Sequence, residues 1–333
     1  MGPDPLLAGL EEIGDLLPGR AGVRAAGELS TRYRAERGAD GRLLSEAEVV
    51  AYAVSRMPAT YAAARSALAA LAVARPEFAP ASVLDLGGGL GAAAFAAAAT
   101  WETIVTVTVV DASGLMIGAG QRLLAAVGDR APAPRFEWQS GDLAQPAHAR
   151  PSRSADLVTL SYVLSELPEV TRRHAIDAAG GAAGGAVVAI EPGTPAGYQR
   201  ILDARADVIR LGFEVAAPCP HSSDCPISGG RDWCHFATRL TRSRAHRAAK
   251  QGQLGYEDEK FSYIAATKLD GAAAATPSSR GRIIRHPTWR KSLVELRVCE
   301  PGEPRVEVVR VARSAGDLYR TARGSTWGDA WPP

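Results

Sequence analysis

The sequence predicts an α/β protein in which a mostly parallel β-sheet is covered by helices on both faces. From residue 82 onward, short apolar runs alternate with helical segments, which is the pattern of parallel strands joined by crossover helices. Residues 104–110 (Ile-Val-Thr-Val-Thr-Val-Val) form the clearest strand in the chain. A glycine-rich stretch at 87–91 follows one predicted strand and opens a predicted helix, which is a common position for a ligand-binding turn.

Residues 1–80 are expected to form an N-terminal helical arm. Leucines recur at helical spacing near the start, Ser45 can cap a helix that ends near Ser55, and Pro58 stands near the start of an alanine-rich helix. The sheet domain is expected over residues 81–333. Its strands are predicted at 82–86, 104–110, 135–139, 157–160, 186–190 and 261–267, and its helices at 90–100, 115–127, 170–179 and 195–212.

The last third of the chain is expected to carry two additions to this sheet. Residues 213–256 predict a basic insertion, in which a loop with three cysteines precedes a helix-compatible basic run at 234–250. Residues 283–333 predict a C-terminal β-hairpin and helix, because 293–299 and 305–311 alternate like paired strands around a Pro-Gly turn.

The composition is that of a globular protein. Hydrophobic residues make up 46% of the 333 residues and charged residues 22%, which excludes a disordered, collagen-like or disulfide-scaffold chain. The formal net charge is +2, but residues 1–200 hold 17 Lys and Arg against 21 Asp and Glu, whereas residues 201–333 hold 21 against 15. All four cysteines lie in this basic third. No signal peptide or transmembrane segment is evident, so we expect an intracellular, reducing location where cysteines serve as metal ligands or catalytic thiols.

The glycine-rich loop carries the strongest cofactor signal. Glycines let a backbone approach a ligand where a Cβ would collide, and the following helix offers free N–H groups. A dinucleotide fingerprint is possible through Gly87, Gly89 and Ala92. However, Asp85 would repel a pyrophosphate and attract the cationic amino group of S-adenosylmethionine. The pattern D-x-G-x-G-x-G, from Asp85 to Gly91, therefore favours a methyltransferase site over a dinucleotide site.

Acidic residues follow the next two strands. Asp111 ends the second strand, where a carboxylate can accept both ribose hydroxyls. Asp142 follows the third strand and is either an adenine-binding group or an ordinary turn residue. Tyr162 follows the fourth strand, where it either orients a substrate or packs in the core. The Asn/Asp-Pro-Pro-aromatic motif of amino-methylating enzymes is absent there, and no catalytic residue is assigned.

The cysteine spacing is Cys219-x5-Cys225-x8-Cys234, followed much later by Cys299. It matches no C-x2-C zinc ribbon, and buried free thiols are one alternative. The loop has little apolar content of its own, so a bound metal would supply order. Four thiolates suit either tetrahedral zinc or an iron–sulfur cluster, and His221 or His235 could replace a cysteine at zinc.

Basic residues follow the third cysteine directly. Their spacing suggests one helix face for binding an RNA backbone, although a solvated helix surface is the alternative. The predicted RNA-binding residues are Arg239, Arg242, Arg244, Arg247 and Lys250. A second basic run contains Arg280, Arg282, Arg285, Arg290 and Lys291.

Several longer segments resemble a known family over roughly residues 50–333. They are 56–61 (Arg-Met-Pro-Ala-Thr-Tyr), 191–195 (Glu-Pro-Gly-Thr-Pro), 217–221 (Ala-Pro-Cys-Pro-His), 232–236 (Asp-Trp-Cys-His-Phe), 256–263 (Tyr-Glu-Asp-Glu-Lys-Phe-Ser-Tyr) and 327–329 (Trp-Gly-Asp). The chain resembles the methyltransferase-like small-ribosomal-subunit assembly factors, the mitochondrial Rsm-twenty-two type and its bacterial relatives.

The resemblance implies a class I, Rossmann-like methyltransferase fold, association with small-subunit ribosomal RNA, and an iron–sulfur cluster of the 4Fe-4S type. That cluster maps onto Cys219, Cys225, Cys234 and Cys299, with zinc as the alternative. We therefore expect an S-adenosylmethionine-binding protein that acts on or with this RNA, or else a non-catalytic assembly factor that keeps the fold. A nicotinamide-dependent oxidoreductase is a third class, against which Asp85 argues. A monomeric, cytoplasmic protein without a membrane partner is expected.

Overall fold

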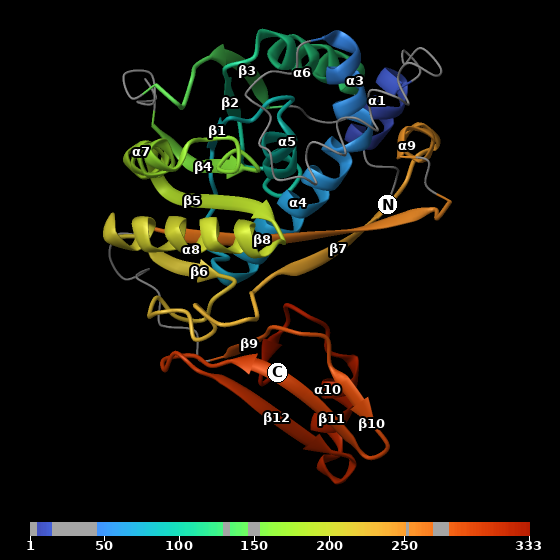
Figure 1. Cartoon of the computed structure of the whole chain (residues 1–333), viewed down its shortest axis with the longest axis vertical. Coiled ribbons are helices and arrows are strands. Elements are labelled where there is room, and N and C mark those ends of the chain that lie inside the picture. The colour runs from blue at the N-terminus through green and yellow to red at the C-terminus, as the bar shows by residue number, and fades with distance from the viewer. Residues whose placement is uncertain (1–4, 15–44, 129–133, 146–153, 251–252, 269–279) are drawn as a thin grey trace.

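The computed structural model describes residues 5–14, 45–128, 134–145, 154–250, 253–268 and 280–333 (Figure 1). Residues 15–44 of the expected helical arm lie outside the described part. The described residues form two β-sheets and the helices that cover them.

The main sheet has the order β3-β2-β1-β4-β5-β8-β6, with β7 paired to β8. Strands β1 to β5 pair in parallel, whereas β8 runs antiparallel between β5 and β6. This order, with one antiparallel strand between the fifth and sixth, is that of the class I methyltransferase fold, so the predicted fold class is confirmed. The strands are β1 (Ser82–Leu86), β2 (Thr106–Asp111), β3 (Arg135–Ser140), β4 (Ala155–Ser161), β5 (Ala183–Pro192), β6 (Glu214–Ala217), β7 (Phe236–Thr241) and β8 (Tyr256–Thr267).

Helices cover both faces of this sheet and bury two apolar cores. The helices are α1 (Pro5–Gly14), α3 (Glu46–Ser55), α4 (Met57–Ala74), α5 (Ala92–Ala98), α6 (Gly114–Val127), α7 (Glu169–Ala182) and α8 (Pro195–Arg210). Leu68 and Leu71 of α4 are fully buried in one core with Val107 of β2. Ile176 of α7 and Val208 of α8 belong to the core on the other face. Helix α4 is thus part of the sheet's cover.

The helix predicted over residues 234–250 is wrong. Residues Phe236–Thr241 form β7 and pair antiparallel with β8, and only Arg244–Lys250 form a helix, α9. The reason lies in the side-chain period: Phe236 and Leu240 are buried, whereas Ala237 and Arg239 between them are exposed, which is the alternation of a strand. The side chains of Arg239, on the strand, and Arg247, on α9, therefore do not share one helix face.

The C-terminal residues build a second, five-stranded sheet of order β10-β11-β9-β13, with β12 paired to β11. The predicted hairpin is confirmed, because β11 and β12 pair antiparallel. This sheet and α10 enclose a small core that includes Val294, Leu296 and Ala322. The elements are β9 (Gly281–Ile283), β10 (Thr288–Arg290), β11 (Leu293–Cys299), β12 (Val306–Ala312), a 3-10 turn (Arg313–Ala315), α10 (Asp317–Gly324) and β13 (Ala330–Trp331).

The segment between β6 and β7 lies between the two sheets (Figure 1). Arg282 of β9 donates a hydrogen bond to the carbonyl of Pro218 at 3.0 Å, and Arg285 donates to Asp232 and to the carbonyl of Trp233. These contacts tie the C-terminal lobe to the cysteine-bearing segment. Within the described residues, no helix has both the length and the apolar character needed to cross a bilayer.

Candidate functional site

The residues predicted to bind the cofactor lie at one edge of the main sheet. They follow the carboxyl ends of β1, β2, β3 and β4, which are neighbouring strands in the order β3-β2-β1-β4. The strand order reverses between β1 and β4, so this edge holds the switch point at which α/β sheets bind ligands. The loop is anchored there because the amides of Gly87 and Gly88 both donate to the carbonyl of Val110, at 2.8 and 3.1 Å.

The glycine loop needs glycine for its backbone conformation and for space. Gly87 has φ +68° and Gly89 has φ +55°, in the left-handed region that side chains disfavour. A Cβ on Gly87 would lie 2.3 Å from Cγ2 of Val163. These two positions keep the loop tightly folded over the end of β1.

Asp85 lies near the end of β1, against the glycine loop. Its side chain is fully buried, one oxygen accepts a bond from the hydroxyl of Thr159 at 2.7 Å, and the other accepts from the amide of Ala94 at 3.2 Å. A direct bond from Asp85 to a ligand's amino group stays a prediction. The carboxylate ties β1 to β4 and to helix α5 beneath the loop.

Burial raises the pKa of Asp85 to about 6, although the bonds from Thr159 and Ala94 oppose this shift. Because its folded-state pKa lies above the ordinary value, the contribution of Asp85 to stability is most favourable at low pH and falls as the pH rises through this range. We expect the variant Asp85→Asn to gain up to about 3 kcal/mol relative to the wild type between roughly pH 4 and pH 7. Urea unfolding of both proteins across this range measures the difference, and a pH-independent difference would contradict the prediction.

Asp111 braces the loop from the end of β2. Its Oδ2 accepts a bond from the amide of Gly89 at 2.9 Å, and its Oδ1 accepts from the amide of Ser113 at 2.8 Å. Burial raises its pKa. Trp138 of β3, which sequence reasoning missed, donates from Nε1 to the carbonyl of Gly89 at 3.2 Å. A carboxylate oxygen has two lone pairs, so Asp111 retains accepting capacity beyond these bonds.

Asp142 lies at the same edge, but its carboxylate closes its own turn. Oδ1 accepts from the amide of Ala144 at 2.8 Å, and Oδ2 accepts from the side chain of Gln145 at 3.0 Å. This geometry is that of an Asx turn, the alternative that the sequence left open. A second lone pair on each oxygen leaves room for a further donor.

Tyr162 is held at the end of β4 in a strained conformation. Among the described residues, it is the only non-glycine residue with a positive φ, at 60°, a conformation that costs about 1–3 kcal/mol. Its hydroxyl donates to Glu259 of β8 at 2.9 Å, and Glu259 also lies 3.8 Å from Arg56. Burial and the negative charge of Glu259 raise the pKa of Tyr162 well above its usual value.

Arg56, Tyr162 and Glu259 form a group at the carboxyl edge of the sheet. Arg56 lies between α3 and α4, Tyr162 follows β4, and Glu259 is on β8. Sequence reasoning missed Arg56 and Glu259 as site residues. The available signal was their place in segments 56–61 and 256–263, which carry the family resemblance.

All four cysteines line one cavity, of about 40 Å³, between α8, the segment after β6, β7 and the C-terminal sheet. This cavity volume exceeds the roughly 10–15 Å³ that one water molecule needs. His221 also lines it, with Nε2 3.6 Å from Sγ of Cys299. His235 does not, since it stacks on Trp233 with ring centroids 5.2 Å apart. The structure thus joins Cys299 to three cysteines that lie far from it in sequence.

The thiols surround the cavity without converging on one point. Among the described residues, no three His, Cys, Asp or Glu side chains are placed to hold a single metal ion. A tetrahedral zinc site needs all four sulfurs about 2.3 Å from one centre. A cluster with several irons binds each thiolate through a different iron, so the sulfurs can stand further apart.

The wall of the cavity holds a buried arginine and thiols whose burial disfavours the thiolate form. Arg205 is buried, donates to the carbonyl of His221 at 3.0 Å and lines the cavity, yet its Nε has no partner among the described residues. Burial raises the pKa of Cys219 and of Cys234, and it raises that of Cys299 to about 12. Burial thus favours the protonated form of these three thiols. A metal centre would supply the positive charge that stabilises them as thiolates.

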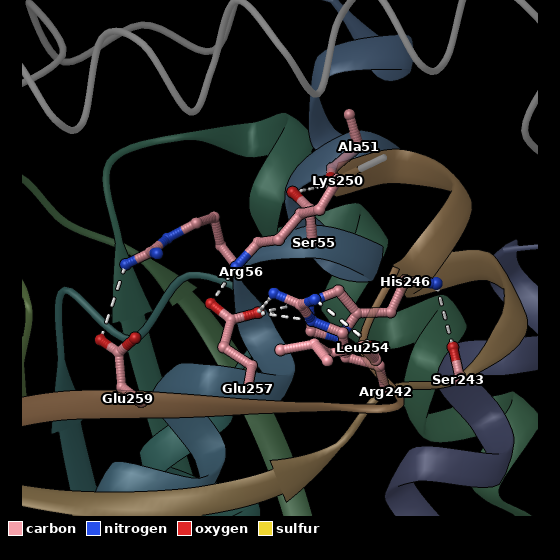
Figure 2. Close-up of polar contacts among 10 residues, drawn as sticks. All are labelled: Ala51, Ser55, Arg56, Arg242, Ser243, His246, Lys250, Leu254, Glu257 and Glu259. Atoms are coloured by element: carbon pink, nitrogen blue, oxygen red, sulfur yellow. Dashed lines mark hydrogen bonds and ion pairs between the residues drawn. The ribbon is translucent and has the colours of Figure 1, made fainter. Parts of the chain in front are cut away.

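Three of the five predicted RNA-binding residues are paired with acids of β8, and Figure 2 shows two of them, Arg242 and Lys250. Arg242 and Lys250 both contact Glu257, as does the buried His246, whose Nε2 lies 3.2 Å from the carboxylate. Arg239 forms two bonds with Asp258, at 2.7 and 2.8 Å. The other two predicted residues, Arg244 and Arg247, are exposed and make no ion pair within the described part of the chain.

Comparison with known proteins shows the family to which this chain belongs. The family described as mitochondrial small ribosomal subunit Rsm22 matches residues 46–332. The human mitochondrial ribosome assembly protein METTL17 is 29% identical over 295 residues, covering 84% of this chain and 62% of the human protein. The mitochondrial Rsm22-cox11 tandem protein 2 of Schizosaccharomyces pombe is 25% identical over 345 residues, covering 87% of this chain and 44% of that protein. The chain thus spans less than two thirds of each relative's length.

Solved structures with a similar fold include S-adenosylmethionine-dependent enzymes. A magnesium protoporphyrin IX methyltransferase from Synechocystis is 15% identical, with a TM-score of 0.41 over 72% of this chain and 93% of the enzyme. An O-methyltransferase family protein from Burkholderia thailandensis is also 15% identical, with a TM-score of 0.42 over 75% of this chain and 73% of that protein.

The expected cytoplasmic location is corrected by the family match. The family and both relatives are described as mitochondrial, and these matches point to a mitochondrial location.

Proposed function

Because this chain belongs to the Rsm22 family of mitochondrial small ribosomal subunit proteins, we propose that it binds S-adenosylmethionine and acts with the small ribosomal subunit and its RNA during assembly. The observation that carries the cofactor part is the glycine loop from Gly87 to Gly91, which lies at the switch point of the main sheet and is braced by Asp111. This is the place at which α/β sheets of this kind hold a nucleotide-like ligand.

Each residue at this edge has a role in the proposal. Gly87 and Gly89 let the backbone approach the ligand closely, and Asp111 accepts the ribose hydroxyls through its remaining lone pairs. Asp142 faces the adenine, and Tyr162 shapes the side on which the methyl group lies. Asp85 acts from beneath the loop by fixing its conformation.

We also propose that Cys219, Cys225, Cys234 and Cys299 hold an iron–sulfur cluster of the 4Fe-4S type. The cavity that all four cysteines line and the neighbouring Arg205 support this assignment. A cluster bound there would supply cross-links between the segment 213–256 and the C-terminal lobe at 283–333. On this proposal both units are attachments of one methyltransferase-fold domain.

A non-catalytic assembly factor that keeps the fold is the second candidate. It is favoured by the end of β4, which lacks the Asn/Asp-Pro-Pro-aromatic motif and where the hydroxyl of Tyr162 is already bonded to Glu259. No described residue at this edge stands out as a base that would activate a nucleophile. Transfer would then depend on the alignment of substrate and methyl donor.

The test is methyl incorporation into immature small ribosomal subunits. Subunits from cells that lack the protein are incubated with labelled S-adenosylmethionine and either the wild type or Asp111→Asn. Label in the RNA with the wild type, reduced at least about tenfold in the variant, supports the enzyme. Rescue of assembly by both proteins without label supports the non-catalytic factor. If the wild type neither labels the subunits nor binds them, the proposed function fails.

A further inference from the structure

The C-terminal lobe carries an open basic cleft that no part of the proposed function uses. Its volume is about 570 Å³, within the rough range of 300–1,000 Å³ for small-molecule sites. Residues of strand β10 and helix α10 both line it. The lining residues are Trp289, Arg290, Lys291, Arg313, Gly316, Tyr319, Arg320 and Arg323.

The cleft concentrates positive charge that the fold does not neutralise. Five of its eight lining residues are Arg or Lys, and no carboxylate lines it. Arg320 pairs with Asp317 at the start of α10, but the other four cations form no ion pair within the described part of the chain. Like charges held in one cleft repel each other, so folding alone gives no reason to gather them.

This arrangement contrasts with the basic run at 239–250. There, Arg242 and Lys250 are bound to Glu257, and Arg239 to Asp258. Guanidinium groups that already have carboxylate partners are less available to phosphates. The cations around the cleft are therefore more available to phosphates than Arg239 and Arg242 of the basic run.

An exposed indole completes the site. The side chain of Trp289 is 66% exposed beside the cations, although large apolar side chains are normally covered. Tyr319 of α10 is a second, half-buried ring in the lining. A cationic groove combined with an exposed ring is the combination that binds single-stranded nucleic acid, with phosphates on the cations and a base stacked on the ring.

We propose that this cleft binds single-stranded RNA, with a base stacked on Trp289 and the backbone held by Arg290, Lys291, Arg313 and Arg323. The proposal deepens the proposed function, because it assigns the contact with ribosomal RNA to the C-terminal lobe. It places that contact away from the cofactor edge of the main sheet.

The test uses the full-length protein and a fluorescein-labelled single-stranded oligouridylate, with fluorescence anisotropy at several salt concentrations. Trp289→Ala should weaken binding roughly 5- to 150-fold, the effect of losing one stacked base. The double variant Lys291→Gln/Arg313→Gln should weaken it further and reduce the slope of log K against log salt by about 1.4, since two cations are lost. The substituted side chains are exposed, and thermal melting checks that each variant is folded.

The matched control is Arg122→Gln/Arg135→Gln, which removes two exposed cations of the main-sheet domain, one on α6 and one on β3. It should leave the affinity within about twofold. If this control loses affinity while the cleft variants bind as the wild type does, the inference is overturned. Binding of anionic lipid vesicles in place of RNA at the cleft would also overturn it. If the wild type and the cleft variants bind the small subunit equally well, the cleft is rejected as the RNA site but the proposed function stands. If the wild type does not bind the small subunit, the proposed function is rejected.

Discussion

Replacing Glu257 by alanine is expected to lower the free energy of unfolding by about 3–5 kcal/mol, the usual result of breaking a buried ion pair from one side. Arg242, Lys250 and His246 all face this one carboxylate (Figure 2). The side chains of Glu257, Arg242 and Lys250 are only 13–16% exposed, and that of His246 is 1% exposed. Without Glu257, at least two cations would remain close together without their shared acid.

The neighbouring acid on β8 provides a matched control. Asp258 pairs with Arg239, but these side chains are 45% and 63% exposed, and exposed pairs contribute about 0–1 kcal/mol. Chemical denaturation of Glu257→Ala and Asp258→Ala compares the two sites. Equal losses in the two variants would mean that Glu257 does not hold α9 against the β7–β8 hairpin.

The same geometry predicts a pH dependence. The hydrogen bonds and charges of His246 and Lys250 outweigh burial and lower the pKa of Glu257. Its stabilising contribution is therefore present above the ordinary carboxyl pKa and is lost as pH falls through the lower folded-state value. The difference in stability between wild type and Glu257→Ala should shrink in acid.

Cys234→Ser is expected to remove the proposed cluster and to lower the melting temperature by about 5–15 °C, because the binding free energy of a structural metal centre is also folding free energy. The backbone of Cys234 is fixed by Ser262, whose hydroxyl donates to its carbonyl at 2.8 Å. Losing the cluster would leave buried thiols and Arg205 around an empty cavity. The segment from Pro218 to Cys234 should then become accessible to protease.

Metal and sulfide analysis of anaerobically purified protein measures this effect, together with absorbance near 400 nm, an approximate expectation for thiolate-bound iron. Ser228→Ala is the control, since this hydroxyl donates to the carbonyl of Cys225 at 2.8 Å but is exposed. The wild type and Ser228→Ala should contain iron and sulfide, and Cys234→Ser should not. Stoichiometric zinc without iron in the wild type would reject the cluster.

Local pattern was sufficient to predict the sheet and the position of the glycine loop. The alternation in residues 104–110 and the glycine run after Leu86 depend on short-range preferences, and the structure has β2 at Thr106–Asp111 and the loop at the end of β1. The β11–β12 hairpin was similarly predictable from two alternating strands and a Pro-Gly turn. These features are determined by side-chain period and by glycine, which a sequence displays directly.

Features that depend on distant partners were not predictable in this way. A basic run shows charge but not the acids that neutralise it, so Arg242 was expected on an RNA surface although Glu257 of β8 binds it. The sequence shows that Asp85 lies at the end of the first strand. It does not show that the carboxylate oxygens accept hydrogen bonds from Thr159 and Ala94. The cleft around Trp289 joins residues up to 34 positions apart, and no local motif marks it.

Isothermal titration calorimetry with S-adenosylmethionine and its demethylated product tests the central claim most directly. We expect the wild type to have one binding site for these ligands. We expect Asp111→Asn to bind them about 10- to 150-fold more weakly, as for the loss of a bond to a charged group. Asp156→Asn, at the opposite edge of the sheet where Asp156 accepts bonds from Ser82, should bind as the wild type does. If the wild type binds neither ligand, the proposed cofactor site is contradicted.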